Sequence, residues 1–336
     1  MKSIRSLLIL LMLVACVTPF DFDAETSDDL LVVFGTLTPG PNASNIRLTR
    51  TTEFGTNGAT VENATITLFD DLGNSESYIN LLNGNYILRK ENINIVTGRS
   101  YHVEIALNGE TYRSTPQKMP LLVEADSTYF EIATDVFEYE SGLRRDELFI
   151  KLYVDTPING EETSFLRWSI DGVFQIALSP CPGQVPCSCY YPTDNPNTDI
   201  LLFDGTTISS DRINRVELMS KRPFPNYEYL VRHYFNVYQQ ALTEETYQYW
   251  KAVDLVSRQS GSLFDAVPAA VEGNIFNVSD PDENILGFYQ VVNVDTVRTF
   301  ATQASLRPYE VYQERIPLPC PGNDPSVWNR PSYWGR

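Results

Sequence analysis

Hydrophobic and polar residues alternate over short stretches through the first third of the chain, which is the pattern of half-buried β-strands. Residues 64–69 and 101–107 are the clearest cases, and the Asn108-Gly109 dipeptide that follows the second favours a tight hairpin turn. Turn signals recur at the spacing of a small antiparallel fold. We therefore expect an immunoglobulin-like or transthyretin-like β-sandwich over residues 30–120, ended by a proline-containing linker.

A larger and less regular β-rich region is expected over residues 121–316. Residues 147–155 and 165–170 are predicted to form a strand pair, and residues 229–238 form an aromatic run long enough for a central strand. The run 287–294 is predicted as the closing strand. The fold class expected for the whole chain is therefore mainly β, with an N-terminal sandwich followed by a larger β-rich domain.

One stretch of the second region has helical periodicity. Thr243 is a suitable N-cap, two glutamates follow it in the first turn, and Tyr249, Trp250 and Val253 fall on one face. The pattern predicts one amphipathic helix over residues 244–260, packed on the second sheet.

An apolar run near the N-terminus has the length of a signal peptide and is too short to span a bilayer as a helix. Lys2 and Arg5 precede it, and Leu13-Val14-Ala15-Cys16 ends it. Small residues before a cysteine match the lipobox of bacterial lipoproteins, so residues 1–15 are expected to be removed and Cys16 to carry the lipid. An ordinary signal peptide is the alternative. Residues 16–29 are acidic and are expected to tether the lipid to the first domain.

Charge limits the possible partners. The chain has 25 basic and 43 acidic residues, a formal net charge of −18, and removal of Lys2 and Arg5 would bring it to −20. Such an acidic protein repels phosphate backbones, so no nucleic-acid partner is expected. The favoured interpretation of the acidity is solubility of an exposed surface.

The chain has five cysteines, and lipidation of Cys16 would leave an even set of four. In an oxidising compartment Cys181, Cys187, Cys189 and Cys320 are expected to form two disulfides. Cys187 and Cys189 are too close in sequence to bridge each other easily, so we expect them to pair with Cys181 and Cys320 in one of two orders. A zinc site made of the four thiolates is the alternative.

No motif indicates catalysis. His102 and His233, the two histidines, fall in predicted strands, and neither a Gly-x-Ser-x-Gly nor a His-Glu-x-x-His sequence is present. We therefore expect no enzyme activity, no catalytic residues and no cofactor. A hydrolase would need a pair of carboxylates that converge in a cleft, which the sequence does not single out.

A short acidic segment has the start of a calcium loop. Asp280, Asp282 and Asn284 have the required spacing, but Ile285 and Val291 replace the glycine and the bidentate acid that such a loop needs. We therefore assign no metal site and favour a solvated turn.

Further candidate sites lie outside the regular elements. Ser127 and Thr296 lie in Asp-Ser-Thr and Asp-Thr-Val tripeptides, which resemble an acceptor pattern for O-glycosylation in exported Bacteroidota proteins. The aromatic loop that ends at Tyr190 and Tyr191 and the proline-rich tail over residues 317–336 have the composition of interfaces. Capping of the core by the same aromatic side chains is an equal alternative.

Several of these features occur together in one known group. The lipobox, the early Leu-Val-Val strand and a Gly-Asn-Tyr hairpin are followed by Tyr-Gln-Tyr-Trp in the helix, by Gly273-Asn274-Ile275 and by Leu286-Gly287-Phe288-Tyr289. Together they resemble a family of Bacteroidota outer-membrane lipoproteins with a domain of unknown function, commonly encoded beside TonB-dependent receptors. The resemblance implies a carboxypeptidase-regulatory-like sandwich, an outer-membrane location and a receptor partner, and it supplies no catalytic residues.

These observations predict a protein anchored to the outer membrane by the lipid on Cys16, exposed on the cell surface rather than facing the periplasm. Its expected role is that of a non-enzymatic accessory or binding partner of a TonB-dependent receptor in nutrient uptake. A structural or adhesive cell-envelope lipoprotein without a transport role is the alternative. No particular ligand is predicted.

Overall fold

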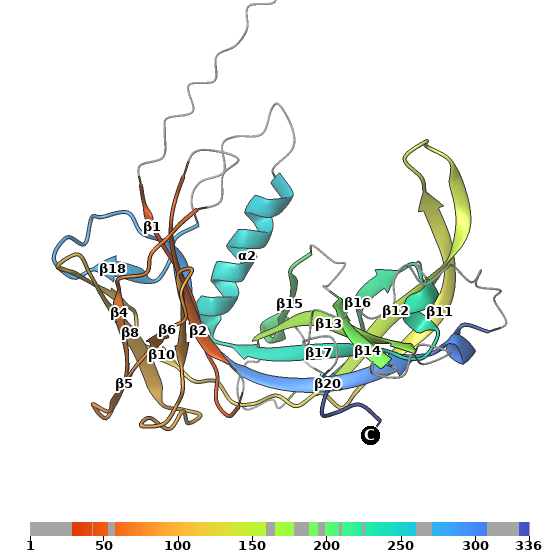
Figure 1. Cartoon of the computed structure of the whole chain (residues 1–336), viewed down its shortest axis with the longest axis horizontal. Coiled ribbons are helices and arrows are strands. Elements are labelled where there is room, and N and C mark those ends of the chain that lie inside the picture. Colours follow the sequence, from red (N-terminus) through yellow and green to blue (C-terminus); the bar gives the residue numbers. More distant parts are fainter. Residues whose placement is uncertain are drawn as a thin grey trace, which may run out of the picture.

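The structure is a computed structural model, and the residues that it describes form mainly β-strands in four sheets, with one α-helix (Figure 1). For these residues the predicted fold class is confirmed. The predicted signal peptide and most of the predicted tether lie outside the described residues, which are 29–41, 43–52, 58–158, 165–177, 188–193, 199–207, 210–223, 226–259, 271–307 and 329–335.

Two six-stranded sheets form the N-terminal sandwich. One has the order β19-β1-β2-β7-β6 with β3 paired to β2, and the other has the order β18-β9-β8-β4-β5 with β10 paired to β8. The predicted alternation positions the core, because Tyr101, Val103 and Ile105 of β8 are fully buried. The strands are β1 (Leu31–Leu37), β2 (Ser44–Arg50), β3 (Ala59–Thr60), β4 (Thr65–Asp70), β5 (Ser75–Ser77), β6 (Ile79–Asn80), β7 (Asn85–Leu88), β8 (Ser100–Leu107), β9 (Glu110–Ser114), β10 (Gln117–Lys118), β18 (Ile275–Asn277) and β19 (Leu286–Val291).

The last two of these strands come from much later in the chain. β19 pairs in parallel with β1, and β18 pairs antiparallel with β9. Tyr289 and Val291 of β19 are fully buried in the core of the first sandwich. The structure therefore differs from the predicted second domain over residues 121–316, because part of that range completes the first domain. Alternation shows which face of a strand is buried, but it does not show which sheet the strand joins.

The second region is also a sandwich. A three-stranded sheet of order β11-β12-β16 packs against a sheet of order β14-β13-β17-β20, with β15 paired to β13. The buried residues Leu152, Leu166 and Val237 come from both sheets. The elements are β11 (Ser127–Glu138), β12 (Arg144–Pro157), β13 (Phe165–Ala177), β14 (Ser188–Thr193), β15 (Leu201–Asp204), β16 (Arg212–Lys221), β17 (His233–Leu242) and β20 (Asn293–Ala301), with 3-10 helices η2 (Gly205–Thr207), η3 (Asn226–Tyr229) and η4 (Gln303–Leu306).

The outer half of the β11–β12 hairpin projects from this sandwich. β16 pairs with β12 only from Ile150 onward, whereas β11 pairs with β12 as far as Arg144. The hairpin therefore continues beyond its sheet as a two-stranded ribbon (Figure 1).

The predicted strand 287–294 is divided between the two sandwiches. β19 ends at Val291 in the first, and β20 begins at Asn293 and pairs with β17 in the second. Between them, Val292 is fully buried and its N–H donates to the carbonyl oxygen of Leu37 at 2.9 Å. The buried crossing joins the two sandwiches directly.

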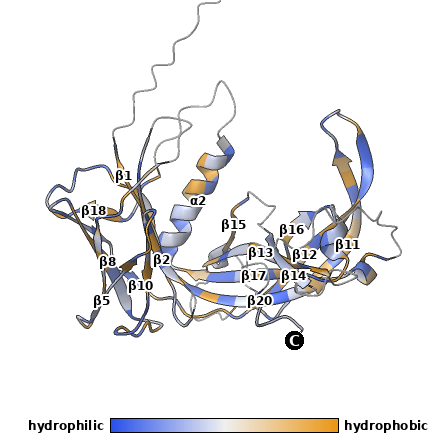
Figure 2. Ribbon diagram, viewed as in Figure 1, coloured by the Kyte–Doolittle hydropathy of each residue, from blue (hydrophilic) through white to orange (hydrophobic). Residues whose placement is uncertain are grey.

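The predicted helix is present as α2 (Glu244–Gln259). As expected for an N-cap, the hydroxyl oxygen of Thr243 accepts a hydrogen bond from the N–H of Thr246 at 3.1 Å. Figure 2 shows both hydrophobic and hydrophilic residues along the helix, which fits an amphipathic element. Among the described residues, no helix combines the length and the apolar character that spanning a bilayer requires.

The position of α2 differs from the prediction, because the helix packs between the two sandwiches and not on the second sheet alone. The Trp250 ring contacts the Phe34 ring of β1 edge-on, with the ring centres 5.8 Å apart. The Arg167 guanidinium of β13 lies 3.7 Å from the centre of the Trp250 ring, and the Trp250 indole donates to Gln290 of β19 at 2.9 Å. One tryptophan thus contacts elements of both sandwiches.

Candidate binding site

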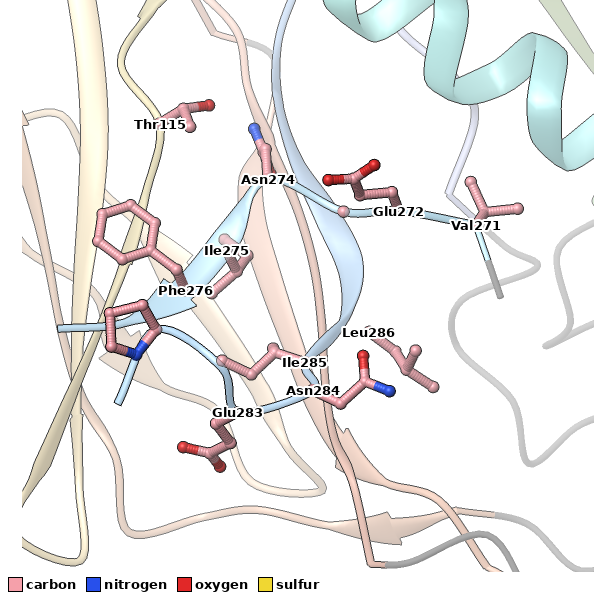
Figure 3. A pocket seen from close by; sticks show the side chains of 12 residues that line it. Thr115, Val271, Glu272, Asn274, Ile275, Phe276, Glu283, Asn284, Ile285 and Leu286 are labelled. Carbon is pink, nitrogen blue, oxygen red and sulfur yellow. The ribbon is translucent and has the colours of Figure 1, made fainter. Parts of the chain in front are cut away.

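A pocket of about 350 Å³ lies beside β18 and β19, and most of its lining comes from the part of the chain that contains these two strands (Figure 3). Residues 271–276 form one wall, and Pro281 together with residues 283–286 forms the other. Thr115, which follows β9, closes one side. The lining residues are Thr115, Val271, Glu272, Gly273, Asn274, Ile275, Phe276, Pro281, Glu283, Asn284, Ile285 and Leu286.

Two glycines allow the backbone segments behind this pocket to approach closely. A Cβ atom on Gly273 would lie 2.1 Å from the carbonyl oxygen of Gly287, and one on Gly287 would lie 2.0 Å from the carbonyl oxygen of Val33. Gly287 also has a φ of +95°, a conformation that other residues rarely adopt. Both positions therefore require glycine.

Asn274 fixes the first wall of the pocket against β19. Its side-chain amide donates to the carbonyl oxygen of Tyr289 at 2.8 Å, and its side-chain oxygen accepts from the N–H of the same residue at 2.8 Å. Asn274 is buried, so this pair of bonds satisfies polar groups that water cannot reach. The side chain replaces a strand partner at this point.

A second hydrogen-bonded group fixes the other wall. The Asn277 amide donates to the Glu283 carboxylate at 2.5 Å, and its oxygen accepts from the N–H of Ser279 at 2.8 Å. The Tyr112 hydroxyl donates to the other oxygen of Glu283 at 3.3 Å. Burial, together with the Glu283 charge, raises the pKa of Tyr112, which therefore stays a neutral donor. Glu283 is thus a structural carboxylate.

Two polar side chains of the pocket take no part in the hydrogen bonds that hold its walls. Glu272 and Asn284 are exposed, and neither makes a hydrogen bond with any described residue. Ile285 and Leu286 form an apolar part of the wall nearby. The pocket can therefore bind a group that carries a positive charge or hydrogen-bond donors next to an apolar part.

The lining does not provide a nucleophile and a base. The hydroxyl of Thr115 already donates to Glu245 of α2 at 3.0 Å, and the described residues that line the pocket include no histidine or cysteine. Ligand binding is the chemistry that this set of side chains supports.

A second pocket of about 350 Å³ lies between the two sandwiches. Thr97, Lys118, Met119 and Leu121 line it from the first sandwich, and Phe165, Leu242 and Glu244 line it from the second region. It has an apolar floor with one lysine and one glutamate.

The predicted calcium candidates lie in an exposed turn next to the first pocket. The N–H of Glu283 donates to the carbonyl oxygen of Asp280 at 3.1 Å, and Asp280, Asp282 and Asn284 are exposed. Within the described parts of the chain, no three histidine, cysteine or acidic side chains are grouped so that they could hold a metal ion.

The structure describes one of the predicted cysteines. Cys189 is fully buried on β14 beside Phe174 and Ile176, and it is disulfide-bonded. Cys16, Cys181, Cys187 and Cys320 lie outside the described residues. The lipidation and the disulfide pairing therefore stay predictions.

The two predicted glycosylation candidates lie on strands. Ser127 is exposed at the start of β11, opposite Asp155. Thr296 is half-buried on β20, opposite Tyr238. Both modifications stay predictions, and Ser127 is the more accessible of the two hydroxyls.

Both histidines lie in strands. The His102 ring stacks on Phe69 in the first sandwich, with the ring centres 5.3 Å apart. His233 is buried on β17, stacks on Tyr229 and has its Nδ1 3.4 Å from a carboxylate oxygen of Glu228. Burial lowers the pKa of both histidines, which favours the neutral form. Neither lines the pocket beside β18 or the pocket between the sandwiches.

The aromatic residues of the tail contact the second sandwich. The Trp334 side chain is buried, and its ring centre lies 4.9 Å from that of Tyr190 and 4.7 Å from that of Tyr234. Its indole N–H donates to Gln175 at 3.2 Å. Of the two interpretations of these aromatic residues, the contacts of Trp334 fit capping of the fold. Trp328 lies outside the described residues.

The sequence did not single out Glu272, and it singled out Asn284 only as part of the calcium-like segment. Their neighbours Gly273 and Gly287 were available as a signal, since paired glycines at the ends of two strands indicate a close backbone approach. Which polar side chains flank the resulting pocket depends on how β18 and β19 are placed.

These features define a class: a protein of two β-sandwiches, joined by strands that cross between them, with an open binding pocket where the late strands enter the first sandwich. The family model described as domain of unknown function (DUF4249) matches residues 17–298, and the chain belongs to this family. No curated protein and no solved structure shows significant similarity to the chain.

Proposed function

We propose that this protein is a lipid-anchored, non-enzymatic binding protein of the outer membrane, and that it acts as an accessory partner of a TonB-dependent receptor in nutrient uptake. The observation that carries the binding role is the pocket beside β18, where Glu272 and Asn284, exposed and without a hydrogen bond to any described residue, lie next to an apolar wall. The walls are held by Asn274, and two glycines let the segments behind them pack closely.

The location rests on the sequence. The lipobox that ends at Cys16 and the resemblance to Bacteroidota lipoproteins support an outer-membrane anchor, with the receptor as the neighbouring partner. The strongly acidic mature chain suits an exposed surface better than contact with nucleic acid.

Affinity isolation from the native outer membrane tests the partner. The wild-type chain is expected to co-purify with a TonB-dependent receptor, and a Cys16→Ala variant is expected to leave the membrane fraction. Isolation of the membrane-bound chain without any receptor would contradict the proposal. A deletion strain that takes up nutrients normally but has an altered envelope would favour the structural or adhesive alternative.

A matched pair of variants tests the pocket. Glu272→Gln removes the free carboxylate and is expected to reduce growth on a limiting nutrient, while the melting temperature stays within about 2 °C of the wild type because the residue is exposed. Asp282→Asn is the control, because it removes a neighbouring exposed charge that does not line the pocket. Equal growth of both variants and the wild type would exclude Glu272 from the function.

A further inference from the structure

An apolar turn stands at one end of the first sandwich. Leu81 and Leu82 connect β6 to β7 and are 56% and 64% exposed. Leu82 has a φ of +72°, a left-handed conformation that leucine rarely adopts. A strained backbone therefore holds a large apolar side chain in solvent, where nothing in the described chain covers it.

The turn is held firmly in this conformation. The N–H of Leu82 donates to the Asn80 side chain at 2.6 Å, and the N–H of Asn83 donates to Glu62 at 3.0 Å. Asn80 in turn donates to the carbonyl oxygen of Glu62 at 2.5 Å. The leucine pair is thus preorganised.

The turn lies at the end of the sandwich where the chain enters it. The N–H of Leu48 donates to the carbonyl oxygen of Gly84 at 2.8 Å, which places the turn beside the last residues of β2. The same end of β2 lies beside the start of β1, because Arg50 is opposite Leu31. In Figure 1 the start of β1 lies at this end of the sandwich.

We propose that the Leu81–Leu82 turn rests on the lipid surface to which the chain is anchored, an inference that depends on the proposed lipid anchor. Residues 17–28, twelve in number, separate Cys16 from Asp29. Fully extended they reach about 45 Å, but a flexible chain of this length has a typical span of about 20 Å. The entry end of the sandwich is therefore held close to the membrane, where burial of leucine is favourable.

Two other projections agree with this orientation. The C-terminal end of α2 and the turn of the β11–β12 hairpin extend toward the same side as the chain entry (Figure 1). They contain Leu255, 58% exposed, and Leu143, 48% exposed. A membrane on this side of the molecule would face three exposed apolar features: the Leu81–Leu82 turn, the C-terminal end of α2 and the turn of the β11–β12 hairpin.

Hydrogen exchange on the lipidated full chain tests the orientation. On phosphatidylcholine vesicles, amides 79–85 are expected to exchange several-fold more slowly than in the same chain without lipid. Amides 70–75 are the internal control, because Leu72 is also exposed, at 73%, but lies in a turn beside Ser100 at the other end of the sandwich. Unchanged exchange over 79–85 in the anchored chain would overturn the inference.

A double variant separates lipid contact from folding. Leu81→Asn with Leu82→Asn removes the apolar side chains, and asparagine tolerates the left-handed conformation at position 82, so the fold is expected to persist. The protection of amides 79–85 is expected to disappear. Protection retained in this folded variant would contradict contact through the leucines.

A second preparation separates this inference from the proposed anchor. The mature chain is held on chelating lipids through a hexahistidine tag in place of Cys16. If the natural chain receives no lipid but the tagged chain shows protection, the anchor proposal fails and the orientation stands. Protection that requires a receptor in the membrane would instead assign the turn to a protein partner and overturn the lipid contact.

Discussion

At the scale of single residues, the glycines beside the pocket have a structural explanation. Gly273, Gly287 and Val33 bring three backbone segments together at distances that leave no room for a side chain. Asn274 then satisfies the backbone of Tyr289. These residues are needed to insert late strands into an early sandwich, and the pocket is a consequence of that insertion.

We predict that Gly287→Ala lowers the free energy of unfolding by about 3 kcal/mol or more, because the new Cβ would collide with the backbone of Val33 and the φ of +95° would be strained. Gly73→Ala is the matched control, since Gly73 has a φ of +84° but open space around its Cα. It is expected to cost about 1 kcal/mol. Urea denaturation measures both, and equal costs would show that the close approach is unimportant.

Asp70 gives the first sandwich a dependence on pH. Burial acts to raise its pKa, but hydrogen bonds from Asn74 and Leu72, together with the Arg99 charge, outweigh burial and lower it below the ordinary value of 3.8. The ionised form is therefore favoured in the folded protein. The resulting stability is present above pH 3.8 and is lost as the pH falls through the lower pKa of the folded state.

We predict that Asp70→Asn destabilises the protein by about 2 kcal/mol at pH 7, because the buried charge, its ion pair with Arg99 and the acceptor for the Asn74 side-chain amide are lost. The difference from the wild type is expected to narrow as the pH falls below 3.8, because Asp70 of the unfolded wild-type chain is then protonated while the folded form gains its proton only at its lower pKa. Denaturation at pH 7 and pH 3 checks this. Exposed Asp282→Asn should change little at pH 7, and a constant gap for Asp70→Asn would refute the ionic explanation.

At the scale of elements, α2 links the two sandwiches. Trp250 contacts β1 and β13, and Tyr249 stacks on Phe288 of β19 with the ring centres 4.3 Å apart. The side of the helix that faces β19 is therefore aromatic. Because α2 contacts both sandwiches, a change in the helix is expected to affect the stability of both.

We predict that Thr243→Ala costs about 1 kcal/mol of stability, because the N–H of Thr246 loses its cap. Thr243→Ser keeps the hydroxyl and is expected to stay within a few tenths of a kcal/mol of the wild type. Thermal and urea denaturation compare the two variants. A similar loss in both would indicate that the Thr243 methyl group, and not the cap, is what matters.

At the scale of the whole molecule, the two sandwiches are not independent units along the chain. β18 and β19 complete the first sandwich, and the chain passes from β19 to β20 through buried Val292. Unfolding of either sandwich is therefore expected to affect the other.

We predict that a fragment of residues 29–126 does not fold. It lacks β19, the parallel partner of β1, and therefore also lacks the core contacts of Tyr289 and Val291. Circular dichroism and amide spectra of the fragment are expected to show an unfolded or aggregated chain, while residues 29–307 give a single cooperative transition. A stably folded fragment would show that the first sandwich is autonomous.

The local pattern was sufficient for several elements. The Asn108-Gly109 dipeptide predicted a hairpin that the structure contains between β8 and β9, since both residues adopt the required positive φ values. Thr243 and the glutamates after it predicted the start of α2, because capping depends on neighbours within one turn. The aromatic strand predicted over residues 229–238 begins and ends later in the structure. Tyr229 lies in η3, and β17 runs from His233 to Leu242.

What the sequence by itself determined is therefore the β-rich class, the helix and the turns, because each depends on residues close together along the chain. Only the tertiary structure decided that β18 and β19 return to the first sandwich, that Trp250 lies between the two, and that Glu272 and Asn284 flank a pocket. The physical reason is that strand pairing and helix docking join residues hundreds of positions apart, and alternation alone does not specify the partner.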